Sequence, residues 1–528
     1  MAPRILGYGA GVRLGGAFLF PVALLAGAVI VVMPTLVVPV LLALAGCFVV
    51  WRWPVLASPV VLLSLMFHTL WFLVFPETPI VKYIELALLA LFAVVIFLSK
   101  STNSERAADL RLPGMLPIAI LAFVTWTLLR SVVMEDQLSA WFGFAAICAY
   151  ALMFVVVSWA TTRVSHLAFW GWSFLFACAV VALVGVGEFV FGWQLHFAGD
   201  PTMEQGHVRI GSALGNPLGL ANFMAVATAI AVSILMVTVR PRVRVLLVCF
   251  LALYNIALLL TMTRSGWFNA GVSVLAVFLS ARKERRRTGL LIAVLFLVLG
   301  AFVVASVYPL LADPAVVRER FAAGFDFTQD AVNADRVLHW RSGWENATKS
   351  PMLFAFGGGP GTVGSAAARV FAMRHSSVGP WDLYKYYFTT ESWILELLNQ
   401  VGILGLILYL SILFAAWRHA KSRTSSGLPS GAVPWLRGYK ASLLGVLCAN
   451  AVLPSLGQWP VSALFWSLLG LVFAGSRLRS GEPAVSRHKG AAFPSRVTAG
   501  HPPVSPRLAR VCVSHGEAAS LTGFGGAP

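Results

Sequence analysis

The chain has 528 residues, of which 59% are hydrophobic and only 11% are charged, and its mean hydropathy is +0.82. No water-soluble globular protein of this size has such a composition, so soluble classes are excluded and we expect a polytopic membrane protein. The formal charge of +18 is spread over loops and a tail, not gathered on one module, so we expect no nucleic-acid partner.

Long apolar runs without a two-residue alternation predict membrane-spanning helices and not a β-barrel. The run from 15 to 50 exceeds one bilayer crossing and contains Pro34, so we expect two spans hinged there. A signal peptide is the alternative for the first of them, but no small-residue cleavage site leads into a soluble domain. Further spans bring the expected total to about fourteen. They are expected at 57–75, 80–98, 113–130, 140–160, 167–191, 216–239, 245–262, 265–280, 288–310, 392–416, 441–456 and 459–475.

Basic residues gather in the loops on one side of these spans, and the positive-inside rule makes that side cytoplasmic. Both termini are then cytoplasmic. The sequence divides into N-terminal spans (1–312), a large external loop (313–391), C-terminal spans (392–475) and a basic tail (476–528). The composition of the tail is typical of disorder, and its basic residues either bind anionic membrane lipid or only mark the cytoplasmic side.

The expected external loop holds most of the candidate catalytic and binding residues, since it mixes Arg, Asp, Glu, His, Trp and Tyr in an otherwise apolar chain. Arg336 and Trp340 are one helical turn apart and share a face, and Arg341 follows directly. A binding helix and an amphipathic helix lying on the membrane are both open interpretations.

Two more features of this loop stand out. The glycines of GGGPG, Gly358 and Gly359 among them, permit close backbone approach, but the Lys-Ser/Thr ending of a nucleotide-binding loop is missing. Glu391 leads into the next span, where it is either a reactive carboxylate or a helix cap. The aromatic run 381–388, with Tyr386, forms either sugar-stacking surfaces or an interfacial belt.

Two arginines lie at short gaps on the external side. Arg264 in TMTRSGWF sits between two closely spaced spans, against the usual charge preference of that side. It is either a snorkelling interfacial residue or part of an anion site. Arg209, before the span that begins near 216, is a second and weaker candidate.

No His, Cys, Asp or Glu spacing in the sequence indicates a metal site, and five of the six cysteines lie in apolar runs. We therefore expect no metal, no cofactor and no disulfide framework.

Four motifs follow one another between 205 and 416: SALGNPLGLANF, TMTRSGWF, an R-x-x-x-W pair with a following SP and GGGPG, and ES-x-x-L-x-x-L-x-x-x-GI-x-G. In this order, on one membrane face, they resemble the bacterial O-antigen ligase and polysaccharide polymerase superfamily. The resemblance matches Pro351, Gly402 and Gly405 to family positions. It implies a GT-C type of helical bundle and a glycosyltransferase that uses glycans carried on undecaprenyl diphosphate, without metal or nucleotide.

Two departures from the family pattern matter. Many members, ligases especially, have His-Asn where this chain has Glu391-Ser392, and the Glu-Ser form is more similar to exopolysaccharide or capsule polymerases. The usual Pro-Asn is Pro217-Leu218 here, which leaves the role of Asn216 open.

Together with the resemblance, the residue chemistry assigns expected roles. Arg264 and Arg336 would stabilise the departing diphosphate, since guanidinium groups bind phosphate in bidentate fashion, and Glu391 would be the general base for the acceptor hydroxyl. The expected substrate-binding residues are Arg341, Arg209, Trp340, Gly358, Gly359 and Tyr386.

The sequence thus favours a polymerase of undecaprenyl diphosphate-linked repeat units, making exopolysaccharide, capsule or O-antigen at the outer face of the bacterial cytoplasmic membrane. Its expected partners are the lipid-linked donor and acceptor, membrane lipid and a chain-length regulator. A ligase of the same family is one alternative. A transporter or flippase for a lipid-linked or amphiphilic solute is the other, with Glu85 and Glu188 as candidate intramembrane carboxylates.

Overall fold

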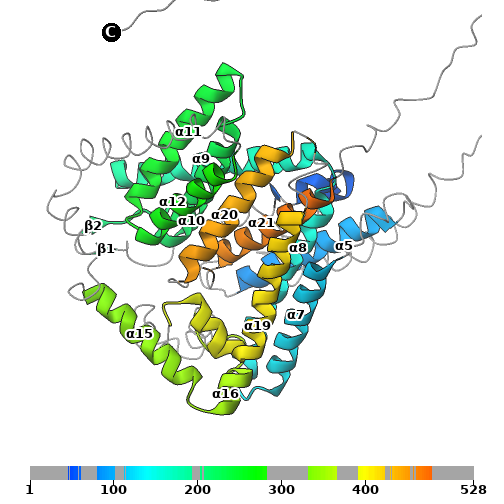
Figure 1. The fold of residues 1–528 in the computed structure, drawn as a ribbon, viewed down its shortest axis with the longest axis vertical. Coiled ribbons are helices and arrows are strands. Elements are labelled where there is room, and N and C mark those ends of the chain that lie inside the picture. Colours follow the sequence, from blue (N-terminus) through cyan, green and yellow to red (C-terminus); the bar gives the residue numbers. More distant parts are fainter. Residues whose placement is uncertain are drawn as a thin grey trace, which may run out of the picture. The chain divides into compact units, whose positions relative to one another are not determined.

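The computed structural model describes residues 46, 48–57, 59–60, 80–101, 112, 114–192, 203–204, 207–281, 331–364, 390–422, 429, 431–451, 456 and 459–478. Nearly all of them are helical, which confirms the predicted all-α class (Figure 1). The exception is a small antiparallel ladder between β1 (Met203–Glu204) and β2 (His207–Val208). The helices are η2 (Pro54–Leu56), α5 (Ile80–Ser101), α7 (Met115–Val133), α8 (Gln137–Ala160), α9 (Val164–Phe191), η4 (Ser212–Leu214), α10 (Pro217–Leu235), α11 (Pro241–Leu260), α12 (Arg264–Leu279), α15 (Ala331–Ala347), α16 (Pro351–Phe356), α19 (Trp393–Ser422), α20 (Val433–Ala451) and α21 (Trp459–Arg477).

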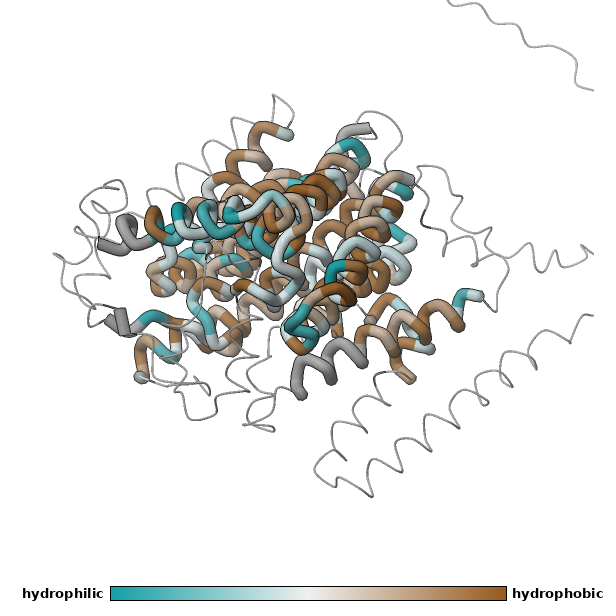
Figure 2. The backbone as a smooth tube through the Cα atoms, turned by 90° about the horizontal axis from the view of Figure 1, so that it is seen from below, coloured by the Kyte–Doolittle hydropathy of each residue, from teal (hydrophilic) through white to brown (hydrophobic). Residues whose placement is uncertain are grey.

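Seven helices of the described part are long and apolar enough to cross a membrane, which confirms a polytopic helical protein. They are α7, α8, α9, α10 and α11 together with most of α19 and α21. Figure 2 shows long stretches of hydrophobic residues along the helices of the described part. The total of fourteen stays a prediction, because the spans expected at 15–50, 57–75 and 288–310 fall largely or wholly outside the described residues.

The span expected at 265–280 coincides with α12, whose 16 residues are short for a crossing, so its crossing of the membrane stays a prediction. α20 begins at Val433 instead of 441. Arg437 and Lys440 explain this difference, because basic residues near the start of an apolar run were interpreted as loop. Long basic side chains can extend from a helix end toward water, so they do not mark the boundary reliably.

α10 lies at the centre of the described bundle. In its apolar 18-residue stretch 94% of the residues are buried, against 28% in the corresponding stretch of α7. α12 and α20 pack against it through small residues. An added Cβ at Gly266 would overlap with Ala221, and one at Gly445 would overlap with Asn269 and Ser273. Between α10 and α12 the Asn269 amide donates to Asn222 Oδ1 at 2.9 Å, a buried contact that joins the two helices.

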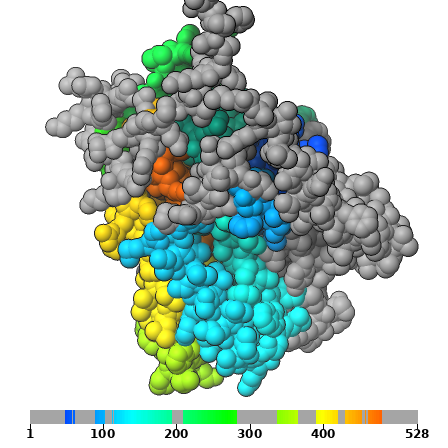
Figure 3. Space-filling view, turned by 90° about the vertical axis from the view of Figure 1, so that its right-hand side faces the viewer, coloured from blue at the N-terminus to red at the C-terminus, as the bar shows by residue number. Residues whose placement is uncertain are grey.

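On the other side, α19 lies along α7, and α8 packs against α21 (Figures 1 and 3). α19 is broken at Gly402, whose φ of 68° and ψ of −177° are not helical. Such a break frees carbonyl groups that the bilayer cannot hydrate, so they need partners from elsewhere in the protein. The glycine turn that follows α16 supplies two of these partners, and Trp126 of α7 supplies a third by donating its Nε1 to Val401 O at 2.9 Å. α15 packs against the first half of α19.

Candidate functional site

Three non-glycine residues of the described part have left-handed backbone angles: Ser212 (φ 53°), Met262 (φ 51°) and Glu391 (φ 47°). Met262 and Glu391 lie two residues before α12 and α19, and Ser212 begins η4, which leads into α10. Side chains strain the backbone in this region, and such residues cluster at functional sites. Their shared location therefore marks a candidate site.

Contacts between helices place all three residues at one end of the bundle. Ser233 Oγ donates to Pro434 O at 2.7 Å and Ser442 Oγ donates to Val226 O at 3.4 Å, so α20 runs antiparallel to α10. The last residue of α20, Ala451, accepts a hydrogen bond from Ser392 Oγ at 3.0 Å. The start of α19 therefore lies at the same end as the start of α10.

The start of α12 lies at that end too, because Gly266 packs directly on Ala221, in the second turn of α10. Arg264 is the first residue of α12. The structure thus places Arg264 and Glu391, which are far apart in sequence, at the same end of one bundle.

Arg209 joins Arg264 in an arginine corner formed by residues 209 and 261–264. Its Nε donates to Thr261 O at 3.1 Å, and its Nη2 donates to Thr263 Oγ1 at 3.0 Å. These bonds fix the turn from α11 into α12, so Arg209 supports the backbone that carries Arg264. The backbone ahead of α10 is held similarly, since Ser212 N donates to the buried Glu188 carboxylate at 2.7 Å.

Asn216, whose role the sequence left open, caps α10. Its side chain accepts from Leu218 N at 2.8 Å and from Gly219 N at 3.3 Å, with Pro217 in the first turn. Asn followed by Pro is a typical start of a helix, so this role was readable from the sequence.

Glu391 is half-buried and is held by its backbone. Trp340 Nε1, on α15, donates to Glu391 O at 3.0 Å. In the described part of the chain the Glu391 carboxylate has no hydrogen-bond or ion-pair partner, and it makes no capping bond to α19. A strained backbone with an uncommitted carboxylate is an arrangement suited to accepting a proton.

The inward face of α15 carries Arg336, Trp340 and Gly343. Gly343 packs against Thr390, and Asn346 Nδ2 donates to Asn399 Oδ1 on α19 at 2.7 Å. Arg336, one turn before Trp340, is less exposed than the two residues that follow it. The helical spacing predicted from the sequence thus sets Arg336 on the face that contacts the start of α19.

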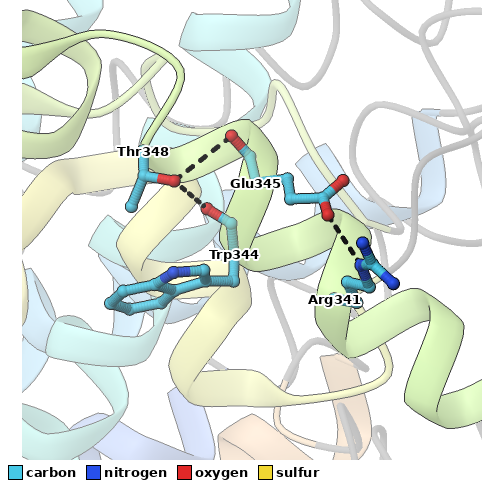
Figure 4. A network of polar contacts seen from close by, with 4 residues as sticks. All are labelled: Arg341, Trp344, Glu345 and Thr348. Carbon is cyan, nitrogen blue, oxygen red and sulfur yellow. Dashed lines mark hydrogen bonds and ion pairs between the residues drawn. The ribbon is translucent and has the colours of Figure 1, made fainter.

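Arg341 lies on a different face of α15, beside Glu345 one turn further along the helix (Figure 4). Its side chain is 75% exposed and its Nε forms an ion pair with Glu345 Oε1 at 2.8 Å. This hydrogen bond, with the charge of Glu345, raises the pKa of the Arg341 guanidinium. Arg341 and Arg336, close in sequence, therefore lie in different surroundings, and a substrate contact of Arg341 stays a prediction.

The glycine turn 357–364 is fixed to the broken helix α19. Gly358 N donates to Asn399 O at 2.6 Å and Gly359 N to Gln400 O at 2.7 Å. The break at Gly402 leaves these two carbonyls without their helical donors, and the turn replaces them. A substrate phosphate could use Gly358 and Gly359 as backbone donors only if these bonds opened, so their predicted contact stays a prediction.

Sequence reasoning missed three buried residues of α19: Glu396, Asn399 and Gln400. Asn399 Nδ2 donates to Gly343 O at 2.9 Å, and Gln400 Nε2 donates to Val363 O at 2.9 Å. Polar residues inside an apolar span are a signal that could have found them, because the bilayer disfavours such residues unless they have partners.

Tyr386 and the aromatic run 381–388 lie outside the described residues. Within the described residues, no group of three or more His, Cys, Asp or Glu side chains could hold a metal ion.

Residues 245–410 match the family model described as O-antigen ligase. The predicted resemblance to the O-antigen ligase and polymerase superfamily is confirmed. The match contains Arg264, Arg336 and Glu391 and covers roughly a third of the chain. It indicates a glycosyltransferase-like enzyme of the membrane that acts on lipid-linked glycans, consistent with polysaccharide biosynthesis. No curated protein matches the chain.

Proposed function

We propose that this protein is a polymerase of undecaprenyl diphosphate-linked oligosaccharide repeat units, acting at the outer face of the bacterial cytoplasmic membrane. The observation that carries the proposal is the joint placement of Glu391, strained and uncommitted, and Arg264 at one end of the bundle. This pairing supplies a proton acceptor and a fixed positive charge, the two groups that glycosyl transfer from a lipid diphosphate needs.

In the proposed reaction, an acceptor sugar hydroxyl attacks the anomeric carbon of the donor glycan. The new glycosidic C–O bond forms as the bond from that carbon to the diphosphate oxygen breaks. The hydroxyl proton passes to the Glu391 carboxylate, and the electron pair leaves with the diphosphate. Arg264 and Arg336 stabilise the charge that grows on this leaving group, and the step uses neither metal nor nucleotide.

Polymerase is preferred over ligase because Glu391-Ser392 replaces the His-Asn pair of many ligases. Glu188, a candidate for solute transport, is instead engaged by the Ser212 backbone at the site end of α9, which weakens the transporter alternative. A chain-length regulator is the protein partner that a polymerase of this kind would take.

The test is purified protein in liposomes, supplied with lipid-linked repeat units. Longer glycans on undecaprenyl diphosphate are the expected product. Transfer of a glycan to a lipid core or a protein, without extension, would identify a ligase. Movement of the substrate across the bilayer without new glycosidic bonds would overturn the proposal in favour of a transporter.

The proposal requires residues 313–391 to be external and both termini cytoplasmic. Single cysteines at Ser376 and Ser425, on a cysteine-free background, would be treated with an impermeant thiol reagent on intact cells. We expect labelling at 376 and protection at 425. The reverse pattern would put Glu391 on the wrong side for an externally presented substrate.

A further inference from the structure

Glu396 is a buried carboxylate, 4% exposed, on the first turns of α19. No basic side chain of the described residues forms an ion pair with it. Its hydrogen bond comes from Gln400 Nε2, at 3.1 Å to Oε1. A carboxylate is costly at such a position without a specific use, so its contacts merit a physical explanation.

Gln400 uses both ends of its amide. Its Nε2 donates to Val363 O at 2.9 Å as well as to Glu396, and its Oε1 accepts from Gly361 N at 3.4 Å. The Glu396 carboxylate and the Val363 carbonyl are both acceptors, so they orient the amide nitrogen toward themselves. The amide oxygen then faces Gly361. Glu396 therefore helps to set the orientation in which Gln400 holds the turn.

Gly364 packs directly on the Glu396 carboxylate, where an added Cβ would overlap with Oε1, and its φ is 78°. Gly361 packs in the same way on Ser139 and Gly143 of α8. The turn is thus fixed between two helices, directly before residues 365–389, which are not described. The described chain resumes at Thr390 and Glu391, less than two helical turns before Glu396.

We infer that Glu396 is a positioning residue for glycosyl transfer: through Gln400 and Gly364 it fixes the exit of the external loop relative to Glu391. The inference rests on the proposed function for its kinetic consequence. Glu396 acts here as a hydrogen-bond acceptor and a packing surface. It does not contact substrate, and the arginine corner does not depend on it.

Two substitutions test whether Glu396 acts by accepting the hydrogen bond from Gln400 or only by filling space. Glu396→Gln keeps an acceptor oxygen for Gln400, whereas Glu396→Leu keeps similar bulk and removes it. We expect Glu396→Gln to extend chains within about threefold of wild type. Glu396→Leu should lower kcat at least about tenfold while the KM for the lipid-linked donor changes by less than about twofold, because a misplaced base slows the step without removing donor contacts.

Amide hydrogen exchange supplies a readout that does not require activity. Exchange of a peptide covering 357–364 should be faster in Glu396→Leu and in Gln400→Leu than in wild type, and unchanged in Glu396→Gln, because Gly361 N donates to Gln400 Oε1 and the turn is held through that side chain. If Glu396→Leu cannot be purified, Gly364→Ala disturbs the same contact from the other side and should give the same split between kcat and KM.

Wild-type kcat and wild-type exchange in Glu396→Leu would overturn the inference. So would a rise in the donor KM without a change in kcat, since that assigns Glu396 to donor binding. Equal losses in the Gln and Leu variants would overturn the hydrogen-bond role and leave the charge as the cause. Failure of the wild-type protein to extend chains would count against the proposed function alone, because the exchange measurement still tests the contact.

Discussion

The two halves of the candidate site are built in different ways. The arginine corner sits on α10, α11 and α12, in which no interior residue has a left-handed backbone, and these helices meet through small residues and an Asn–Asn bond. Glu391 sits at the start of a broken helix, α19, whose free carbonyls are bonded by a turn some forty residues earlier. One half depends on side-chain packing and the other on backbone hydrogen bonds between distant segments.

This difference has a consequence for function. Arg264 is placed by helices that pack closely on one another. Glu391 is placed by contacts with segments remote in sequence: Trp340, the glycine turn and the break at Gly402. The base should therefore be sensitive to substitutions far from it, whereas the arginine should be sensitive mainly to its own replacement and to that of Arg209.

The largest expected effect is on the base itself. Glu391→Gln is nearly isosteric and should slow chain extension by about 10²–10⁴-fold, the range for a positioned general base, while donor binding is retained. Its stability should be unchanged, because the carboxylate has no partner within the described residues. Extension rates, donor binding and thermal unfolding would be measured together. A stable Glu391→Gln protein with near wild-type extension would remove the base assignment.

The next effect concerns the break in α19. Gly402→Ala places a Cβ against Ala355 and Gly357 at a left-handed φ, so backbone strain of about 1–3 kcal/mol adds to a steric overlap. Loss of expression or a clearly lower unfolding temperature is expected. The matched control is Gly271→Ala in α12, where no atom lies within 4 Å and alanine favours the helix. Equal stability of the two variants would contradict the contrast between the halves.

The helices could be predicted from the sequence because they depend on the length of apolar runs. The grouping of the motifs could be predicted because it depends on their order along the chain. It identified Arg209 and Arg264, which the structure brings together at one turn. It did not reach Asn399 or Gln400, because their partners are backbone atoms of a remote turn, and no local pattern encodes such a pairing. The left-handed φ of Glu391 is likewise imposed by tertiary contacts.

Arg264→Ala should remove a charge-assisted interaction with diphosphate worth roughly 1.5–3 kcal/mol, a loss of at least about tenfold in transfer. Arg264→Lys should recover only part of it, since the ammonium keeps the charge and loses the planar fork. Arg209→Ala sharpens the comparison, because Arg209 holds the turn that carries Arg264. Its effect should be less than additive with Arg264→Ala, and full additivity would mean that the two arginines act independently.

Trp340→Phe tests the link between α15 and Glu391. The substitution keeps an aromatic ring and removes the donor to Glu391 O, a hydrogen bond worth about 1 kcal/mol, so transfer should fall by about fivefold or less. Trp344→Phe is the control, because Trp344 is 53% exposed and its ring lies against Phe354 of α16. Steady-state extension rates of the two variants should differ, and equal rates would show that the Trp340 bond does not position the base.

The smallest expected effect is that of Arg341→Ala, which is compared with Arg336→Ala on the same helix. Arg336→Ala should lower transfer at least about tenfold if the inward face of α15 meets the diphosphate, as the placement of Trp340 supports. Arg341→Ala should leave transfer within about twofold, because an exposed ion pair contributes little and the side chain points away from the Glu391 contact. Raising the salt concentration tests the same distinction, since it screens exposed charges and affects partly buried ones less. A loss in Arg341→Ala as large as in Arg336→Ala would mean that substrate reaches both faces of α15, and the one-sided arrangement proposed for the site would have to be abandoned.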